Sequence, residues 1–302
     1  MSDLNIYADQ TAIDALPPIT GDVVLRASDN AVLLYNGSAW KEFQPDAGPG
    51  FSNQYSVSLD GSNDYIDCGG DADFSFTDGA GNDSAFSVSA WVKFDSITRA
   101  RIISKDVSTG SREYLFGTNN ANKVNMILGT GSVNLDIQNN TAINTTAWFH
   151  IVATYDGSKS ASGLKVYVNA DASSLSDNSV GSYSGMASTI GNLEFGRFAN
   201  GHSFFNGLMD DVAVFDYELT EPEVAALRDT SGSNPVPANI SSLSPVGWWR
   251  MGENDGGTGS TITDKGSGGN DATLMNGADI YSGTLDPNPD GAGPDFSSSI
   301  PS

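Results

Sequence analysis

From Phe51 to about Asp229 the chain is a succession of short segments in which apolar and polar residues alternate, separated by Gly, Asn, Asp and Ser. In the segment 86–94, the even-numbered residues are apolar, whereas the odd-numbered ones include two serines, Trp91 and Lys93. Because the side chains of a strand point alternately to its two faces, this period of two predicts strands with one buried face. Many such strands with turn residues between them indicate an all-β sandwich.

One helix is well signalled, at the end of this region. The sequence Thr220-Glu-Pro-Glu223 has the spacing of a capping box, in which Thr220 caps the helix and Glu223 bonds back to the capping residue. A proline fits the first helical turn, where its missing N–H is not needed. Val224, Ala225 and Leu227 are then available for packing.

Residues 1–43 predict a separate small unit. The segments 23–28 and 31–36 are predicted to be strands around an Asp29-Asn30 turn, and Asn36-Gly37 marks a second turn before a strand at 40–43. A three-strand meander of this size is marginally stable alone, so we expect it to dock on another surface or on copies of itself. The Pro/Gly-rich stretch 44–50 is predicted to be a linker.

Five strand motifs follow one another in fixed order at 55–67, 86–94, 148–157, 164–169 and 206–215, among them Trp148-Phe-His-Ile-Val and Gly207-Leu-Met-Asp-Asp-Val. Together they resemble the laminin-G-like domain, a concanavalin A-like jelly-roll β-sandwich. The resemblance implies an all-β fold, a short helix after the final core strand, and a binding or display role in place of a catalytic one.

The segments 246–256 and 264–277 resemble the opening strands of another such domain, yet the motifs that would follow them are missing, and the domain that begins near Tyr55 lacks this opening. An orphan pair of strands buries too little apolar surface to stand alone. We therefore predict that residues 231–302 supply a linker and strands that complete the sandwich of 51–230, in the same chain or in a neighbouring copy. A truncated independent repeat is the alternative.

Charge and composition narrow the classes of function. With 302 residues, 38% of them hydrophobic, the chain can bury a sizeable core, and its formal net charge of −23 repels phosphate backbones and anionic membrane surfaces. Nucleic acid and membrane insertion are therefore not expected. The acidity either keeps the surface soluble or supplies carboxylates for calcium. Cys68 is the single cysteine, so no intrachain disulfide can form.

The sequence carries no recognisable catalytic motif. The Glu-x-Asp-x-x-Glu string of sandwich glycanases is absent, and Glu218, Glu221 and Glu223 group at the helix start, where the helix dipole accounts for them. His150 lies within a strand and is predicted to be a core or hydrogen-bonding residue, while His202 lies in a loop. The protein is therefore predicted not to be an enzyme.

Calcium is the sharpest chemical hypothesis for this chain. Asp210 and Asp211 lie in a strand that is apolar on both faces, and a buried carboxylate needs a partner or a metal. The resemblance implies a structural calcium between an early and the last strand, which would bring Asp60 toward this pair, with Asp64 and backbone carbonyls completing the shell. The alternative is that these carboxylates accept hydrogen bonds from backbone N–H groups at turns.

Aromatic residues in loops are the usual platforms for sugar rings, and one such cluster is predicted here. It comprises Phe198, His202, Phe204 and Phe205. Tyr114 and Tyr183 lie in other loop-rich regions. The alternative is that these rings pack inside the sandwich or at a subunit contact.

The segment 35–43 is similar to short β elements of phage tail-fibre and other virion surface proteins. With no secretory signal and no apolar stretch approaching the roughly 18 residues that span a bilayer, release on a virion is one route to an extracellular role. We therefore predict a phage virion structural protein, a tail fibre or spike or a capsid decoration protein, exposed on the virion surface. It would contact other virion proteins through residues 1–43, form a homo-oligomer such as a trimer, and adhere to host-surface glycans. A free carbohydrate-binding adhesin and a glycan-cleaving enzyme are the alternatives.

Overall fold

A computed structural model of the chain divides into two units, Met1–Ser52 and Asn53–Ser302, which are described separately. The structure describes residues 5–7, 11, 13, 23–26, 31–35, 40–42, 53–70, 72–108, 111–130, 132–198, 201–230 and 235–282.

The N-terminal unit is a small sheet whose strands follow one another in the order β1-β2-β3-β4. Its members are β1 (Asn5–Tyr7), β2 (Val23–Arg26), β3 (Ala31–Tyr35) and β4 (Trp40–Glu42). The last three form the antiparallel meander predicted from the sequence. The additional strand β1 runs parallel to β2, a pairing that the alternation did not indicate. The predicted turns at 29–30 and 36–37 and the linker 44–50 lie outside the described residues.

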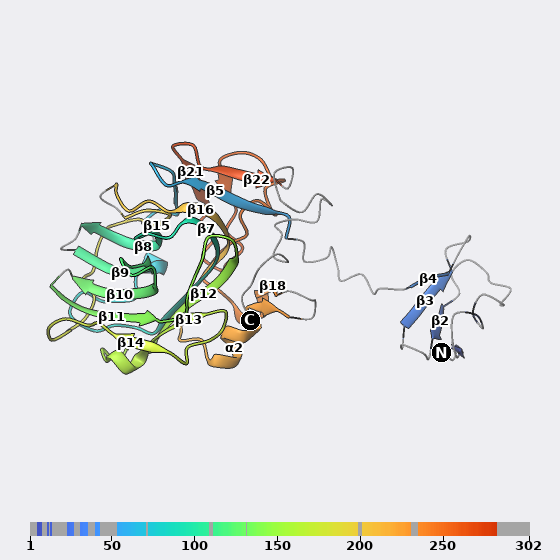
Figure 1. Cartoon of the computed structure of the whole chain (residues 1–302), viewed down its shortest axis with the longest axis horizontal. Helices are drawn as coiled ribbons and strands as arrows, with labels where there is room; N and C mark the ends of the chain where they lie inside the picture. The colour runs from blue at the N-terminus through green and yellow to red at the C-terminus, as the bar shows by residue number, and fades with distance from the viewer. Residues whose placement is uncertain are drawn as a thin grey trace. The chain divides into compact units, whose positions relative to one another are not determined.

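The second unit is built on two large antiparallel sheets (Figure 1). Nine strands form the first sheet, in the order β14-β11-β10-β9-β8-β15-β6-β21-β20. Their bounds in that order are Leu175–Asp177, Val133–Asn139, Val124–Thr130, Ser111–Thr118, Arg101–Ser108, Leu193–Phe195, Tyr65–Asp67, Ala272–Met275 and Thr261–Ile262.

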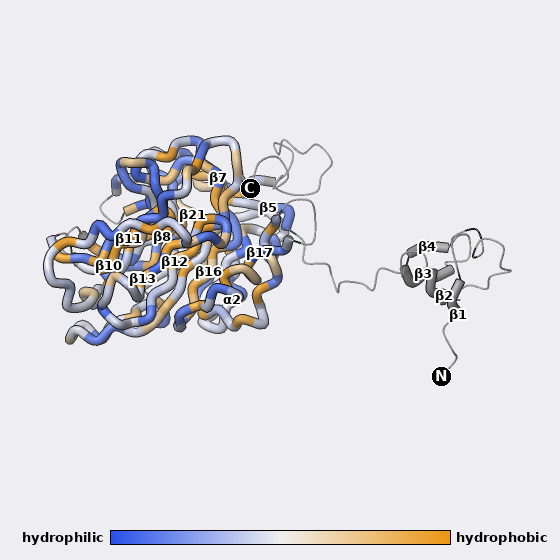
Figure 2. The backbone as a smooth tube through the Cα atoms, turned by 60° about the horizontal axis from the view of Figure 1, so that its bottom comes forward, coloured by the Kyte–Doolittle hydropathy of each residue, from blue (hydrophilic) through white to orange (hydrophobic). Residues whose placement is uncertain are grey.

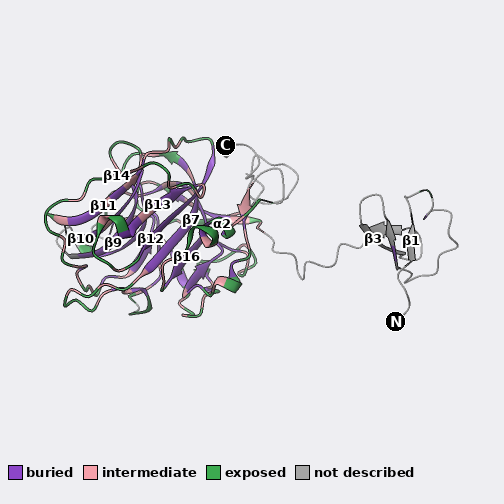
Figure 3. Cartoon of the chain, turned by 90° about the horizontal axis from the view of Figure 1, so that it is seen from below, coloured by how far each residue is buried: buried purple, intermediate pink, exposed green. Residues whose placement is uncertain are grey.

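The second sheet has seven strands, in the order β13-β12-β7-β16-β5-β22, with β19 also paired to β16. The bounds of these seven, in the order just given, are Leu164–Val168, Trp148–Tyr155, Phe86–Ser96, Asn206–Phe215, Tyr55–Asp60, Asp279–Ser282 and Gly247–Trp249. Their central strands are buried along almost their whole length (Figure 3).

The core lies between the two sheets and follows the alternation of the sequence. In β7 the even-numbered residues from Phe86 to Phe94 belong to the main apolar cluster, and in β12 Phe149, Ile151 and Ala153 do so. Apolar segments accordingly run through the interior of the sandwich in Figure 2, with hydrophilic segments between them. This arrangement confirms the predicted concanavalin A-like jelly-roll sandwich.

The C-terminal segment completes both sheets within the same chain. Strand β21 pairs with β6, placing Leu274 opposite Ile66, and β22 pairs with β5, placing Ile280 opposite Val57. Strand β19 pairs with β16 and brings Trp249 into the core, where its ring centroid lies 5.5 Å from that of Phe74. Strands from the far end of the chain thus stand beside the first strands of the domain.

The predicted helix is α2 (Glu221–Ala226), and its capping box is formed, because the Thr220 backbone N–H donates to Glu223 Oε2 over 2.8 Å. A two-stranded ribbon follows, made of β17 (Arg228–Asp229) and β18 (Val236–Pro237). Short 3₁₀ turns are η1 (Ala72–Phe74), η2 (Ala161–Gly163) and η3 (Ser241–Leu243). Among the described residues, no helix is long and apolar enough to cross a membrane.

Candidate functional site

Polar side chains gather on the outer face of the nine-stranded sheet, the face turned away from the core. Residues directly opposite one another in a ladder share a face, and the register of β8 to β11 aligns Ser104, Leu115, Ile127 and Asp136 in one row. Rows on either side carry more polar residues. We call this surface the polar face; its polar members are Arg101, Ser104, Asp106, Arg112, Asn125, Asn134 and Asp136.

The strands that build the polar face show why the sequence places these residues there. In β11 polar residues alternate with Leu135 and Ile137, both of which belong to the core, so Asn134 and Asp136 must point outward. In β9 Gly117 lies between Arg101 and Asn125 in the ladder, and a Cβ there would come within 2.3 Å of the Ala100 carbonyl oxygen. Glycine therefore permits the irregular pairing that sets Arg101 on this face.

The polar face is largely closed to solvent, yet several of its hydrogen-bonding atoms have no partner. Arg101 is 6% exposed, Arg112 8%, Asn125 1% and Asn134 9%. The Nε atoms of both arginines and the Oδ1 atoms of both asparagines make no hydrogen bond. Buried polar groups are nearly always paired with protein or water. Two donors and two acceptors are thus buried here without a hydrogen-bond partner.

The polar face carries two positive and two negative side chains, which interact with one another. Burial lowers the pKa of Arg101 to about 10, and the nearby positive charges of Arg99 and Arg112 add to this effect. Burial likewise lowers the pKa of Arg112 and raises that of Asp136, whose charged form is supported by a 2.8 Å hydrogen bond from Asn125 Nδ2. Asp106 and Asp136 both interact electrostatically with the two arginines. With a pKa of about 10, Arg101 is cationic at neutral pH.

Apolar atoms form the middle and one side of the polar face. Leu115, fully buried, and Ile127, half-buried, occupy its central row. From the β15–β16 connection, the Phe198 ring stacks on His202 with centroids 4.8 Å apart, and the Arg112 guanidinium lies 5.4 Å from the Phe198 centroid. Apolar surface surrounded by donors and acceptors is the composition expected of a ligand site.

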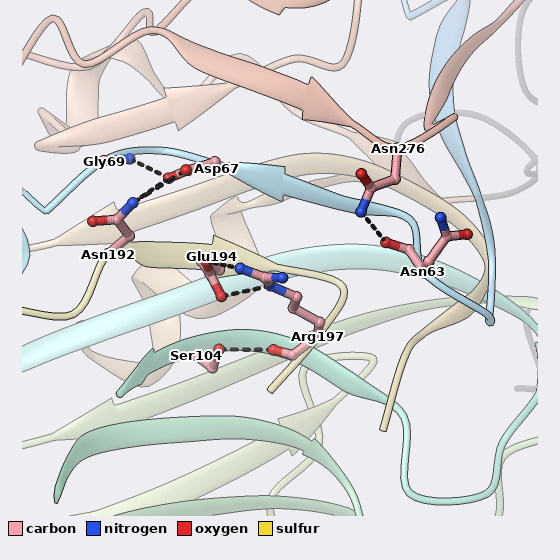
Figure 4. A network of polar contacts seen from close by, with 8 residues as sticks. All are labelled: Asn63, Asp67, Gly69, Ser104, Asn192, Glu194, Arg197 and Asn276. Atoms are coloured by element: carbon pink, nitrogen blue, oxygen red, sulfur yellow. Dashed lines mark hydrogen bonds and ion pairs between the residues drawn. The ribbon is translucent and has the colours of Figure 1, made fainter. Parts of the chain in front are cut away.

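The polar face continues across β15 and β6 as a network of paired groups (Figure 4). Ser104 Oγ donates to the Arg197 carbonyl oxygen over 2.8 Å, and the Arg197 Nε donates to Glu194 Oε2 over 2.9 Å. The Arg197 guanidinium also lies 3.4 Å from the Tyr65 ring centroid. On β6, Asp67 accepts 2.9 Å hydrogen bonds from Asn192 Nδ2 and from the Gly69 N–H. These pairings leave β8 to β11 as the stretch with unpartnered atoms.

The aromatic cluster predicted from the sequence is divided by the structure. Phe198 and His202 lie beside the polar face, with Phe198 buried and His202 exposed. Phe205 is fully buried in the core, where it contacts the Phe94 ring at 5.4 Å between centroids, and Phe204 is half-buried.

The two tyrosines considered beside that cluster have structural contacts. Tyr114 lies in the core and donates to the Phe74 carbonyl oxygen over 3.0 Å. Tyr183 packs against the core and donates to Asp83 Oδ2 over 2.7 Å.

The four carboxylates predicted to bind calcium lie at two separate places. Asp60 caps a tight turn, accepting from the N–H groups of Ser62 and Asn63, and the Asp60 N–H donates to Asp64 Oδ2. Asp60 pairs with Asn206 at the start of β16, so Asp210 is four residues, or about 13 Å, further along that strand. A structural calcium stays a prediction, which thermal melts with and without a chelator would test.

Asp210 and Asp211 instead interact electrostatically with Glu253, a residue that no pattern in the sequence indicated. Asp211 has a positive φ of 39° at a bulge in β16 and accepts from the Trp248 indole N–H over 2.8 Å. Glu253 accepts from the Gln54 and Tyr55 N–H groups. Burial raises the pKa of Asp211 to about 6 and, together with the charge of Asp211, that of Glu253 to about 8. In the described part of the chain, no group of three or more His, Cys, Asp or Glu residues is arranged to hold a metal ion.

His150 occupies the position predicted for a structural histidine. It is fully buried on the outer face of the seven-stranded sheet, stacks on Trp91 and lies 2.9 Å from Ser89 Oγ through Nε2. Burial and the charge of Arg228 lower its pKa to about 3, so the ring is neutral at physiological pH.

The residues of the polar face were missed because each of them looks ordinary in sequence. The available signal was the period-two pattern in 133–139, where Asn134, Asp136 and Gln138 alternate with apolar residues. That pattern predicts a polar outer face. It does not indicate that Arg101 and Arg112, from other strands, share it.

Comparison with protein families identifies the fold family directly. Residues 60–225 match the family model described as the concanavalin A-like lectin/glucanases superfamily. The matched residues make up more than half of the chain. The protein therefore belongs to this superfamily. No curated protein matches the chain.

Solved structures with the same fold share little sequence with it. A "putative carbohydrate binding protein" from Bacteroides ovatus ATCC 8483 is 20% identical, with a TM-score of 0.51 over 76% of this chain and 60% of that one. A heptameric SAP-like pentraxin from Limulus polyphemus is 18% identical over 60% and 84% of the two chains, with a TM-score of 0.40. The CBM40 of a Ruminococcus gnavus IT-sialidase is 14% identical over 57% and 96%, with a TM-score of 0.42.

Proposed function

We propose that this protein is a non-enzymatic carbohydrate-binding protein whose ligand site is the polar face of the nine-stranded sheet. The observation that carries this proposal is the set of four buried and unpartnered atoms on one face, two guanidinium N–H donors and two amide oxygen acceptors. A superfamily named for lectins and glucanases, and a Bacteroides ovatus relative described as carbohydrate binding, support the same class of ligand.

The chemistry of a sugar fits this arrangement. A sugar ring has apolar C–H edges and hydroxyl groups that both donate and accept hydrogen bonds. The half-buried Ile127 would offer apolar contact, while Arg112 and Asn134 carry an unpartnered donor and an unpartnered acceptor on strands to either side of it. The ring of Phe198 and the exposed His202 would border the bound sugar.

The biological setting proposed here is display on a phage virion. The chain divides into two units after residue 52, and the sandwich lies in the second of them, an arrangement suited to an attachment element carrying a binding module. The element would join other virion proteins, copies of the chain would assemble into a homo-oligomer, and the sandwich would adhere to host-surface glycans. A free adhesin is the alternative setting.

Cleavage of the glycan is disfavoured because the two carboxylates that lie directly opposite each other on this sheet, Glu194 and Asp67, are both engaged. Glu194 accepts from Arg197 and Asp67 from Asn192. Glycosidases need one carboxyl group that gives up a proton and a second that faces the sugar. Analysis of reducing ends after incubation with bound glycans tests this directly, since any released sugar would contradict a purely binding role.

A glycan array probed with the purified chain tests the proposed site. We expect binding to a defined set of glycans, reduced at least tenfold in Arg112→Gln, which removes one unpartnered donor. Because Arg112 also faces two carboxylates, Asn134→Ala serves as a second variant that changes no charge. Lys165→Gln is the control, since Lys165 is a partly exposed cation on β13. Binding that survives in both face variants would place the site elsewhere.

Deleting residues 1–43 tests the virion setting separately. We expect the shortened chain to bind glycans as well as the full chain, yet to be absent from particles produced with it. If the shortened chain still assembles onto particles, the N-terminal unit is not the attachment element. If no particle incorporates either form, the free adhesin is favoured.

A further inference from the structure

We propose that the cleft between strands β13 and β14 binds an extended, basic peptide segment of a partner protein, which adds to the free edge of β14 as a further strand. The inference goes beyond glycan binding, because it concerns another site and another class of ligand. The polar face is the outer surface of the nine-stranded sheet, whereas this cleft is lined from the edge strands of both sheets. Strand β14 lies at the lower edge of the sandwich in Figure 1.

The cleft has room for a side chain and offers it apolar contact. Its volume is about 400 Å³, within the range of known ligand pockets, roughly 300–1,000 Å³. The half-buried Ala161, Ala172 and Leu175 provide apolar surface that solvent reaches, and the lining residues Ile137 and Leu164 belong to the core. An apolar side chain that enters here would therefore continue the packing of the core.

One side of the cleft is a strand edge that is open for pairing. Among the described residues, β11 is the one strand that pairs with β14. The Asn140 N–H donates to the Ser174 carbonyl oxygen over 2.9 Å, so the even-numbered residues of this segment form the hydrogen-bonded pairs with β11. The backbone N–H and C=O groups of Leu175 and Asp177 therefore point away from β11. Such an edge is a template for a peptide that adds as a strand.

The edge of β13, on the other side of the cleft, is already closed by the chain. The Val166 carbonyl oxygen accepts from Asn139 Nδ2 over 2.9 Å. Val168 and Asp171 exchange two backbone hydrogen bonds of 3.0 Å. The added strand is therefore expected on β14.

The charges that line the cleft favour a basic peptide. Asp177 is exposed and lies opposite Ile137, so its carboxylate is on the side of the sheet that faces the cleft. Glu221 is the second carboxylate of the lining, and Lys165 Nζ lies 4.0 Å from its Oε1 atom and offsets its charge. A lysine or arginine of the peptide would balance the remaining negative charge.

The charge of the whole chain favours a basic partner over a second copy. Two copies with a formal net charge of −23 repel each other, and pairing of their β14 edges would bring two Asp177 carboxylates into one short ladder. An inward-pointing charge on an edge strand is a known protection against such self-pairing. The same potential attracts a basic peptide.

The test uses an array of end-blocked peptides Thr-X-Lys-X-Thr, in which X is Val, Ile, Leu, Phe or Tyr, and the full chain. We expect the tightest member to bind at least tenfold more tightly than its Thr-X-Glu-X-Thr counterpart in fluorescence anisotropy titrations. Asp177→Lys should weaken this binding at least tenfold. Asp279→Lys is the matched control, because Asp279 is exposed on β22, at the opposite edge of the seven-stranded sheet from β13, and should change the affinity less than twofold.

Strand addition also has a signature that attraction between charges does not produce. Alternate N–H groups of a strand face the same neighbour. N-methylation of alternate residues of the peptide should therefore abolish binding in one of the two possible patterns and spare it in the other. Bound peptide should also slow hydrogen exchange at the amides of Leu175 and Asp177.

Three outcomes would overturn the inference. The first is failure of every peptide of the array to bind, and the second is an equal effect of the two N-methylation patterns. The third is a free chain that sediments as a dimer and becomes a monomer in Asp177→Lys, because a second copy would then occupy the edge. Thermal melts establish that both charge-reversal variants are folded.

Discussion

The outer faces of the two sheets both carry buried polar side chains, but the chain itself covers only one of them with apolar residues. On the seven-stranded sheet, Trp91 and Trp148 form a small apolar cluster with Val236 of the β17–β18 ribbon packed against it. On the nine-stranded sheet, the equivalent surface carries two arginines and two aspartates that interact with one another. Buried atoms without a partner lie on both faces, among them His150 Nδ1 and Thr154 Oγ1 on the seven-stranded sheet. What distinguishes the nine-stranded sheet is therefore its charged groups.

The two outer faces differ because different residue types alternate with the core residues along their strands. In β7 and β12 the outward positions include Trp91 and Trp148, and such large rings gain by being covered. In β11 the outward positions include Asn134 and Asp136, which gain nothing from apolar cover. The same period of two therefore builds a structural face on one sheet and a candidate binding face on the other.

The largest effect on stability should come from a substitution on the outer face of the seven-stranded sheet. Trp91→Ala removes a ring that is 1% exposed and stacked on His150, so we expect the free energy of unfolding to fall by about 3–5 kcal/mol. Chemical denaturation measures this, with Ile190→Ala as the control, because Ile190 is 94% exposed and should change stability little. Loss of glycan binding without loss of stability would mean that the roles of the two faces are reversed.

The second largest effect should be a dependence of the free energy of unfolding on pH, caused by the buried carboxylate of Glu253. Burial raises the pKa of Glu253 to about 8 from an ordinary 4.5, so the folded state holds its proton more tightly than the unfolded state. This contribution is fully present below pH 4.5 and is lost as the pH rises through 8.

We therefore expect denaturation to show a decrease of the order of 1–3 kcal/mol between pH 6 and pH 9. Glu253→Gln should flatten this decrease. Glycan affinity of the folded protein should stay level over the same range, because the pKa of Arg101 is about 10. A stability that rises with pH would contradict the assignment.

A smaller effect concerns the helix that precedes the covering ribbon. Thr220→Ala breaks the capping box at the start of α2, and we expect a loss of about 1 kcal/mol. Faster hydrogen exchange should be confined to 220–240 and the strands beneath. Thr146→Ala, in an exposed turn, is the comparison variant. Altered exchange on β8 to β11 would show that the two faces are not independent.

The smallest effect on stability should come from the polar face. The Asn134 Oδ1 atom is buried without a partner, so Asn134→Ala removes little that stabilises the fold, and we expect a change within about 0.5 kcal/mol. Glycan affinity should nevertheless fall several-fold. A large loss of stability would identify Asn134 as a structural residue and weaken the case for the face as a site.

Several elements of the fold could be predicted from local sequence. The alternation in β7 and the capping box of α2 depend on neighbouring residues, and both are formed as expected. The return of β19, β21 and β22 to the first strands could be inferred because an incomplete set of strands cannot bury its apolar face. The parallel pairing of β1 with β2 left no comparable signal.

Predicting the candidate site was harder because it depends on strand order. Phe198 and His202 were predicted from their loop position and lie beside the polar face, whereas Phe205 from the same predicted cluster packs in the core. The carboxylates of Asp60 and Asp210 were expected together, yet the register of β5 and β16 separates them. Glu253 joins Asp211 from more than forty residues away, a contact that no local pattern predicts.

By itself, then, the sequence determined the alternation of buried and exposed positions, the single helix with its cap, the need for the C-terminal strands and a strongly acidic chain. The tertiary structure alone decided which polar residues meet. Arg101, Arg112, Asn134 and Asp136 come from three strands, and only the ladder of β8 to β11 sets them on one face. The physical reason is that periodicity fixes the face of each strand, whereas register and strand order fix its neighbours.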